Sequence, residues 1–344
     1  MKALVLESAK QLRLRDYPIH ETLGPEDVKI QIKACGICGS DIHYYLEGAI
    51  GDFVVKEPMI LGHEAAGIVI EKGKNADNLN LGDLVCMEPG IPSAFSPETL
   101  TGNYNLDPDV TFWATPPIHG CLRETVVHPA RFCFKLPQGL SPAEGAMMEP
   151  LAIGLEAAKK GRIAPGDTAL VIGAGTIGIM AAISAAACGC AKVFISDIKT
   201  EKLGIAGSYP HIVPINTRDL NLVEAVMKET DRQGVDLIIE ASGSPKVYPD
   251  FFRCAKRGGK AVLVGMMNGT VPLDVTLLQV RGISIETIFR YTNAFDRAAA
   301  LVKSGKIDIK RLISKTFSFD HAVEAYQYAA AGYPDVVKVM IELP

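Results

Sequence analysis

Two patterns of apolar and polar residues divide the chain. From about residue 167 onward, short and continuous apolar runs alternate with segments of helical pattern, the first of which is a small-residue helix predicted at 176–188. Such alternation is typical of parallel strands in a sheet that helices cover on both faces. The pattern therefore predicts a doubly wound parallel sheet. Its strands are expected at residues 168–175, 191–197, 211–215, 235–242, 260–266 and 283–289.

The first 150 or so residues follow a different pattern. They are rich in Gly and Pro, and their apolar runs are short and bounded by turn residues. The extreme N-terminus is too charged for a secretory signal and is predicted to form a first strand. We therefore predict an irregular, mostly-β domain in this half. Further elements are expected as strands at 26–35, 65–72, 82–89 and 336–343, and as helices at 144–160, 295–307 and 320–330.

The composition narrows the class of protein. Of the 344 residues, 48% are hydrophobic and 22% are charged, which is the balance of a globular protein. A net charge of −4 offers no basic excess for nucleic-acid phosphates. No run of about 18 apolar residues is free of Gly and charge, so a membrane span is not expected. We expect a cytoplasmic protein whose eight cysteines are thiols or metal ligands rather than disulfides.

A glycine-rich turn follows the first strand of the predicted parallel sheet. Gly173, Gly175 and Gly178 are spaced as G-x-G-x-x-G between a strand and a helix, and Asp197 ends the next strand. In a dinucleotide-binding turn, these glycines permit the tight turn, the approach of the pyrophosphate and the close packing of the helix. Asp197 can accept hydrogen bonds from both ribose hydroxyls and disfavours the 2′-phosphate of NADP, so NAD is predicted, although Lys199 could reach a phosphate. The alternative is a turn that only packs the helix, with Asp197 as a cap.

Three residues of the N-terminal half could bind a metal ion. Cys38, His63 and Glu64 offer a thiolate, an imidazole and a carboxylate, and three protein ligands with an open position are typical of catalytic zinc. Singly, His63 could be a core histidine and Cys38 a small buried hydrophobe. The adjacent His-Glu pair favours a metal, because two ionisable groups would otherwise enter a core without partners. Cys35 and Cys38 could also form a redox pair, but they follow a β-type run instead of opening a helix in a βαβ unit.

Several motifs carry a resemblance to a known family. The segments CGICGSDIHYY, EPMILGHEAAGIV, GNYNLDPDVTFWATPP and EGAMMEPLAIG, together with the glycine-rich turn, resemble the zinc-dependent medium-chain dehydrogenases, in particular the polyol (sorbitol and xylitol) branch. The resemblance implies a GroES-like catalytic domain formed by residues 1–151 and 291–344, and a Rossmann NAD-binding domain at 152–290. It also implies that Cys38, His63 and Glu64 hold one catalytic zinc. Glu149 is then expected beside the metal, as an exchanging ligand or through a water.

The resemblance implies a reaction as well. We expect NAD-dependent oxidation of a polyol, such as xylitol or D-sorbitol, to the ketose by hydride transfer, with zinc as the Lewis acid. Ser40 is expected to begin a proton relay and His43 to end it, although Ser40 could instead cap a helix and His43 could be a surface residue. The residues expected to contact the substrate are Tyr44, Phe112, Thr115, Arg290 and Tyr291, with an ion pair as the alternative role of Arg290.

Further residues are expected to contact the cofactor. They flank the glycine-rich turn or follow later strands of the predicted sheet, whose carboxyl ends line the binding crevice of this fold. These residues are Thr176, Ile177, Ile198, Lys202, Ser242, Val264, Gly265, Ile288 and Phe289.

A second zinc site of this family is predicted to be absent. Its ligands are four cysteines spaced x2, x2 and x7 in the loop after the EPG motif. In this chain that spacing falls on Ser93, Ser96, Thr99 and Asp107, and neutral hydroxyls do not replace thiolates as zinc ligands. We therefore predict one zinc per subunit and no structural zinc, with the loop held by packing and hydrogen bonds.

Other functions and the assembly stay open at this point. A threonine- or butanediol-type secondary alcohol dehydrogenase of the same family is the first alternative. A non-catalytic Rossmann protein and a zinc-free quinone-type reductase fit less well, because the candidate zinc ligands are all present. The resemblance implies a homotetramer, assembled through sheet edges of the cofactor domain.

Overall fold

The computed structural model describes residues 1–267 and 269–344. The chain divides into two compact units, which are described separately. The first unit comprises Met1–Glu149, Phe295–Lys303 and Ile309–Pro344, and the second comprises Pro150–Ala294 and Ser304–Asp308.

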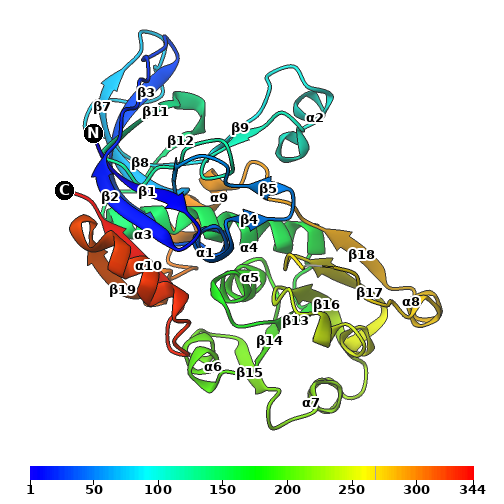
Figure 1. The fold of residues 1–344 in the computed structure, drawn as a ribbon. Helices are drawn as coiled ribbons and strands as arrows, with labels where there is room; N and C mark the ends of the chain where they lie inside the picture. The colour runs from blue at the N-terminus through cyan, green and yellow to red at the C-terminus, as the bar shows by residue number, and fades with distance from the viewer. Residues whose placement is uncertain (268) are drawn as a thin grey trace. The chain divides into compact units, whose positions relative to one another are not determined.

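A seven-stranded sheet forms the centre of the first unit (Figure 1). Its strand order is β12-β8-β7-β3-β20-β19, and β11 pairs with β3. The long strand β3 pairs antiparallel with β7, where Gly36 lies opposite Glu64, and antiparallel with β20, where Gly36 lies opposite Met340. The sheet thus places the end of β3, the start of β7 and the C-terminal strand next to one another. The strands are β3 (Asp27–Gly36), β7 (Glu64–Lys72), β8 (Leu84–Met87), β11 (Thr125–Pro129), β12 (Cys133–Lys135), β19 (Ile313–Ser318) and β20 (Lys338–Glu342).

Smaller elements complete the first unit. A hairpin of β1 and β2 begins the chain, as the sequence predicts for its first strand, and β1 also pairs with β6. The strands outside the large sheet are β1 (Lys2–Ser8), β2 (Gln11–Asp16), β4 (Ala49–Ile50), β5 (Phe53–Val54), β6 (Met59–Ile60), β9 (Gly90–Ile91) and β10 (Thr111–Phe112). The helices are α1 (Gly39–Glu47), α2 (Pro97–Leu100), α3 (Pro142–Ala146), α9 (Phe295–Lys303) and α10 (Ala322–Ala330). The 3₁₀ turns are η1 (Tyr104–Leu106), η2 (Ala130–Phe132), η5 (Lys310–Leu312) and η6 (Phe319–His321).

The helix predicted at 144–160 is two helices in the structure. Helix α3 ends at Ala146, and α4 (Met148–Gly161) begins two residues later. Pro150 explains the interruption, because it has no N–H to donate to the carbonyl of Ala146 and is tolerated only in the first turn of a helix. A capping box between Ser141 and Glu144 fixes the start of α3.

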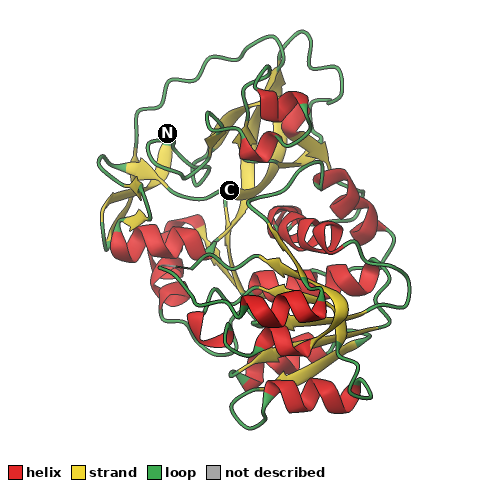
Figure 2. Ribbon diagram, turned by 90° about the vertical axis from the view of Figure 1, so that its right-hand side faces the viewer, coloured by secondary structure: helices red, strands yellow, loops and turns green. Residues whose placement is uncertain are grey.

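The second unit contains the predicted parallel sheet. Six parallel strands follow the order β15-β14-β13-β16-β17-β18, the order of a doubly wound dinucleotide-binding fold. Helices surround the strands (Figure 2). The predicted fold class, a mostly-β unit joined to a doubly wound parallel sheet, is confirmed. The elements are β13 (Thr168–Ile172), α5 (Thr176–Ala187), β14 (Lys192–Asp197), α6 (Thr200–Gly207), β15 (Ile212–Asn216), α7 (Leu222–Glu229), β16 (Val235–Glu240), η3 (Pro245–Val247), η4 (Phe251–Cys254), β17 (Ala255–Leu263), α8 (Val275–Arg281) and β18 (Ser284–Thr287).

The cores of the two sheets explain why these patterns fold as they do. Strand β16 is buried along nearly its whole length, which suits a central parallel strand covered on both faces. Strand β3 instead alternates buried and half-buried residues, as a strand with one partly exposed face does. Within the described residues, no helix is both long enough and apolar enough to span a bilayer.

Candidate metal and cofactor sites

The candidate metal ligands lie where β3 ends and β7 begins. Cys38 is the residue before α1, and His63 and Glu64 stand at the start of β7. The buried carboxylate of Asp41 accepts hydrogen bonds from the backbone N–H of Cys38 and of Gly62, both at 3.1 Å. Asp41 therefore ties together the two backbone segments that carry the thiol and the imidazole.

Two glycines make room at this junction. Gly62 has a φ of +90°, a conformation that side-chain-bearing residues rarely adopt, and this turn leads directly into His63. A Cβ atom on Gly36 would lie only 2.1 Å from Oε2 of Glu64. Any side chain at position 36 would therefore displace the Glu64 carboxylate.

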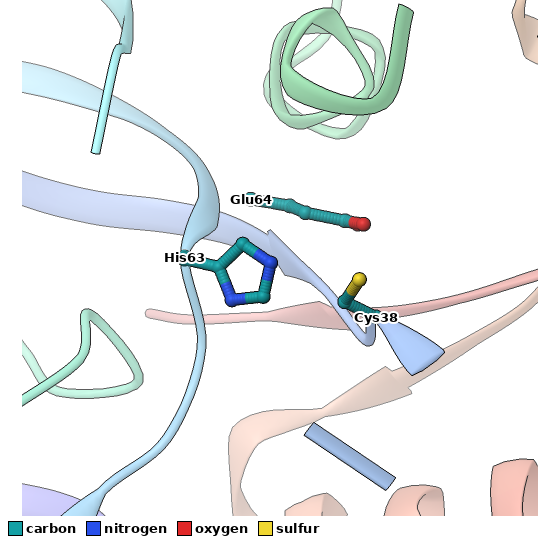
Figure 3. A group of neighbouring side chains, drawn as sticks. All are labelled: Cys38, His63 and Glu64. Carbon is teal, nitrogen blue, oxygen red and sulfur yellow. The ribbon is translucent and has the colours of Figure 1, made fainter. Parts of the chain in front are cut away.

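The three candidate ligand atoms converge (Figure 3). One ligand atom each from Cys38, His63 and Glu64 lies within 4.8 Å of the other two. Thiolate, imidazole and carboxylate are the ligands that zinc takes in proteins, and both His63 and Glu64 are buried. The donor set thus fits a zinc ion. Glu149 does not belong to this group of three, and its part as a ligand stays a prediction.

The charges around His63 favour a cation. Burial opposes a charged imidazole, but the Asp41 carboxylate, 3.7 Å away, and Cys38 outweigh it and raise the pKa of His63 well above its ordinary value. The same negative groups that hold a proton on the ring would favour a metal ion in its place.

Two buried carboxyl groups lie near the site. Glu149 is buried, and its charge contributes to the raised pKa values of Glu88 and Lys338. Burial, and secondly the charge of Glu149, raise the pKa of Glu88 to about 7, although a hydrogen bond from Tyr104 opposes the shift. Glu88 is therefore a carboxyl group that changes charge near neutral pH.

Asp41, Glu88 and Lys338 were not predicted from the sequence as parts of the site. Asp41 could have been found from a local pattern. It lies three positions after Cys38, the residue before α1, and an acidic residue at that position often caps a helix. Lys338 carries a weaker signal, since it is the single basic residue in the apolar strand VVKVMIEL. Glu88 follows a strand and gives no signal of its burial.

The predicted relay residues are both on α1. Cys38, not Ser40, is the residue that precedes the helix, so Ser40 does not cap it. The side chain of His43 is 58% exposed, and its Nδ1 lies 3.3 Å from Glu47. These positions leave the relay roles of Ser40 and His43 as predictions.

The predicted substrate residues are divided between the two units. In the first unit, the ring of Phe112 packs against His63 with 5.7 Å between centroids, Tyr44 is buried, and Thr115 is half-buried. In the second unit, the Arg290 guanidinium lies over the ring of Phe289 at 4.7 Å, and Tyr291 is buried. Their substrate roles stay predictions.

The C-x-x-C segment does not form a thiol pair of its own. The sulfur of Cys35 lies 3.6 Å from that of Cys121, and both thiols are buried. Burial, followed by the contact with Cys121, raises the pKa of Cys35 well above its ordinary value, so it is a poor nucleophile. None of the eight cysteines, all of which lie in the described part of the chain, forms a disulfide.

The glycine-rich turn has the backbone that a dinucleotide site requires. Gly173 has a φ of +96°, and a Cβ on Gly178 would lie 1.8 Å from the carbonyl oxygen of Gly173. Both positions therefore need glycine for the turn and for helix packing. A Cβ on Gly175 would meet no atom within 4 Å, so packing alone does not explain glycine there, whereas a cradle for a closely approaching phosphate does.

Asp197 stands at the end of β14, beside this turn. Its carboxylate accepts hydrogen bonds from the backbone N–H of Ala174 at 2.7 Å, of Ile198 at 2.7 Å and of Lys199 at 2.9 Å. Helix α6 begins after Lys199, so Asp197 is not its capping residue. The carboxylate is held against the glycine-rich turn, and its contact with a ribose stays a prediction.

The other predicted cofactor residues lie in the second unit. Thr176 and Ile177 open α5, and Lys202 lies in α6, where burial, and secondly Lys199, lower its pKa. Ile198 has an exposed side chain. Four others follow the carboxyl ends of β16, β17 and β18: Ser242, Val264, Gly265 and Ile288. Their contacts with a cofactor stay predictions.

The loop from Ser93 to Asp107 is closed by hydrogen bonds. The buried carboxylate of Asp107 accepts from the N–H of Ser93 at 2.5 Å and of Asp109 at 3.0 Å. Ser96 caps α2, accepting from the N–H of Thr99 at 3.2 Å and donating to its hydroxyl at 3.0 Å. The four positions counted as missing zinc ligands thus form two hydrogen-bonded pairs.

Comparison with known proteins identifies the family. Residues 24–138 match the alcohol dehydrogenase GroES-like domain, and residues 176–304 match the zinc-binding dehydrogenase family. The chain therefore belongs to the zinc-dependent medium-chain dehydrogenases, as the resemblance of its motifs implies.

Individual relatives span the whole chain. It is 50% identical to the D-xylulose reductase of Morganella morganii, over 96% of this chain and 98% of the relative. It is 38% identical to the sorbitol dehydrogenase of Arabidopsis thaliana, over 94% of this chain and 90% of the relative. A solved dehydrogenase of unknown specificity from Escherichia coli matches with a TM-score of 0.95 at 28% identity, covering 100% of this chain and 99% of that chain.

Proposed function

We propose that this protein is an NAD- and zinc-dependent polyol dehydrogenase that interconverts a polyol such as xylitol or D-sorbitol and the corresponding ketose. The observation that carries the proposal is the convergence of Cys38, His63 and Glu64. It is supported by 50% identity, over nearly the full length of both chains, to a protein named D-xylulose reductase.

The residues have distinct parts in this reaction. Bound zinc supplies a Lewis acid that favours loss of the substrate hydroxyl proton, and bound NAD supplies the hydride acceptor. Cys38, His63 and Glu64 hold the metal, and Asp41 fixes the backbone that carries them. The Phe112 ring forms an apolar wall against His63.

Polar groups near the candidate ligands transfer the substrate hydroxyl proton to water. Ser40 would accept the proton from the substrate side while it donates its own hydroxyl proton onward, and the exposed His43 would pass a proton to water. Glu149 orients a water or exchanges as a ligand. Substitution of His43 should lower the rate of polyol oxidation.

Several hydroxyl groups distinguish a polyol from a simple alcohol. We assign recognition of these hydroxyl groups to four residues: Tyr44 and Thr115 in the first unit, and Arg290 and Tyr291 in the second. A site built to hydrogen-bond such hydroxyls discriminates against substrates that lack them, because its polar groups would be left unpaired.

NAD is favoured over NADP by the charge at the end of β14. The Asp197 carboxylate would accept hydrogen bonds from ribose hydroxyls and repel a 2′-phosphate. The exposed apolar side chain of Ile198 offers a surface for the adenine. The remaining cofactor contacts are those predicted at Thr176, Ile177, Lys202, Ser242, Val264, Gly265, Ile288 and Phe289.

We further infer a cytoplasmic homotetramer with one zinc per subunit. Free cysteines suit a reducing compartment. Ser93, Ser96, Thr99 and Asp107 lack the thiolates of a structural zinc site.

The test is a substrate panel with NAD, combined with metal analysis. Xylitol and D-sorbitol should reduce NAD, and activity should be lost on chelation and return with zinc at one ion per chain. Faster turnover of threonine or 2,3-butanediol would favour the alternative dehydrogenases of this family. Undiminished turnover after complete zinc removal, or two zinc ions per chain, would contradict the proposal.

A further inference from the structure

A buried lysine contacts one of the candidate zinc ligands. Nζ of Lys338 lies 2.6 Å from Oε1 and 2.7 Å from Oε2 of Glu64, and it donates to the carbonyl oxygen of Ile37 at 3.0 Å. Lys338 is 2% exposed and Glu64 is 1% exposed. All three ammonium protons thus have acceptors, and two of these are the oxygens of a proposed metal ligand.

The strand arrangement builds this contact. Lys338 is the first residue of β20, which pairs with the end of β3. The next residue, Val339, accepts a hydrogen bond from the N–H of Ile37, one position before Cys38. Lys338 is therefore fixed to the segment that leads into the thiol ligand as well as to the carboxylate ligand.

Lys338 is unusual among the buried residues of the described chain. It is the only lysine among them, and its partner lies 274 positions earlier in the sequence. Taking a lysine out of water is strongly unfavourable unless its charge is paired. Glu64 would be equally unfavourable there without a cation, so each group depends on the other when no metal is bound.

A metal ion would change this balance. A carboxylate has lone pairs for several partners, so Glu64 can bind a metal and still accept from Lys338. The ammonium charge then lies one carboxylate away from the metal charge, and the two cations repel each other through a water-poor interior.

We propose that Lys338 is a positioning residue that holds the Glu64 carboxylate in place without metal and lowers the affinity of the site for zinc. The inference rests on the proposed zinc site but not on the identity of the substrate. Lys338 and zinc each stabilise the buried Glu64 carboxylate. Lys338 should therefore add less to folding stability when zinc is bound, and zinc should bind more weakly when Lys338 is present.

The test compares Lys338→Met with Lys29→Met. Lys29 is a matched control, because it also pairs with a glutamate of β7. Its Nζ lies 2.8 Å from Glu71, but this ion pair is on the surface. Each protein is prepared zinc-loaded and zinc-stripped, and its melting temperature is measured, together with the rate at which a chromophoric chelator removes zinc.

Lys338→Met should lower the melting temperature of the stripped protein by about 5 °C or more, because an unpaired carboxylate is left buried. The loaded protein should lose less than half as much, and zinc release should be about tenfold slower than in the wild type. Lys29→Met should change neither quantity. Equal losses in both forms, or unchanged or faster zinc release, would overturn the proposal.

A double variant covers the case in which Lys338→Met does not fold. Replacement of both Lys338 and Glu64 by Met removes the pair together, and apolar residues in place of a buried ion pair are well tolerated. The stripped double variant should fold and melt within about 3 °C of the stripped wild type. If it also fails to fold, the charge argument is wrong.

The outcomes separate this inference from the proposed activity. Neither readout requires a substrate, so the inference can hold for a dehydrogenase of any alcohol. Wild-type protein that binds zinc but shows no antagonism with Lys338 would overturn this inference alone. Wild-type protein that binds no zinc would overturn the metal site and the inference together.

Discussion

At the scale of single residues, buried carboxyl groups outnumber buried cations around the candidate metal site. Asp41, Glu64, Glu88 and Glu149 are all buried in the first unit, and Lys338 donates hydrogen bonds to both carboxylate oxygens of Glu64. A divalent cation held by Cys38, His63 and Glu64 would offset part of this negative charge. The residue environment and the proposed ligand chemistry are therefore consistent.

The carboxyl group of Glu88 makes folding stability depend on pH. Its pKa is raised from 4.5 to about 7 by burial and by Glu149, so the folded chain keeps a proton that the unfolded chain has lost between these values. Its contribution to stability is therefore complete below about pH 4.5 and is lost as the pH rises through about 7. Glu88→Gln cannot ionise and keeps an acceptor for Tyr104. Its stability relative to the wild type should rise by on the order of 3 kcal/mol across this window.

Urea unfolding of both proteins at several pH values measures this effect. Glu98→Gln is a suitable control, because Glu98 lies in the first turn of the short surface helix α2. A stability difference between Glu88→Gln and the wild type that does not vary with pH would show that Glu88 has the same charge in both states.

Asp197 determines cofactor preference in the proposed function. Asp197→Ala removes the acceptor for the ribose hydroxyls and the charge that repels a 2′-phosphate. The ratio of kcat/KM for NAD to that for NADP should fall by about tenfold or more. Asp197→Asn, which keeps an acceptor for Ala174, separates loss of charge from loosening of the turn. An unchanged ratio in both variants would remove Asp197 from cofactor recognition.

At the scale of elements, hydrogen bonds hold the two ends of the loop from Ser93 to Asp107 together. Asp107 joins its end to its beginning through the N–H of Ser93, and the capped helix α2 lies between them. These bonds are made by backbone groups, hydroxyls and the Asp107 carboxylate, and none of them requires a metal. The loop should therefore be insensitive to chelators.

Asp107→Ala should open this loop. It leaves the N–H groups of Ser93 and Asp109 without their acceptor, and loss of such a hydrogen bond costs about 0.5–1.5 kcal/mol. Proteolysis within 93–107 should become about tenfold faster or more. The wild-type loop should be cut at the same rate with and without a chelator, and a chelator-sensitive wild type would indicate a metal in the loop.

The elements that the sequence predicts well are those with a local cause. The apolar runs of β13, β14 and β16 need only their own composition to be recognised, because central parallel strands are buried on both faces. The interruption between α3 and α4 also has a local cause, Pro150, but the apolar pattern continues across it and hides the break. The short helices α6, α7 and α8 were not predicted individually, since each has only seven or eight residues.

The candidate site was predictable only in part. Cys38, His63 and Glu64 stand in motifs with specific spacing, so their types and positions suggested a metal. Lys338 could not be assigned to them, because it lies 274 positions after Glu64 and is brought to it by the pairing of β20 with β3. Local patterns show that a strand exists, but not which strand lies next to it.

At the scale of the whole molecule, the candidate chemistry is distributed between the two units. The proposed zinc ligands all belong to the first unit, whereas the glycine-rich turn and Asp197 belong to the second. A ligand stabilises the state and the region that it binds, so zinc and NAD should leave different traces along the chain.

Hydrogen–deuterium exchange measures these traces. Removal of zinc should raise exchange by about tenfold or more in peptides that cover residues 36–47 and 60–68, because the metal joins the end of β3 to the start of β7. Exchange in β13 and β14 should change much less. Addition of NAD should protect 173–178 in the wild type and fail to do so in Asp197→Ala. If zinc removal raised exchange equally in both units, the metal would support the fold of the entire chain, and its assignment to a site built from the first unit alone would be wrong.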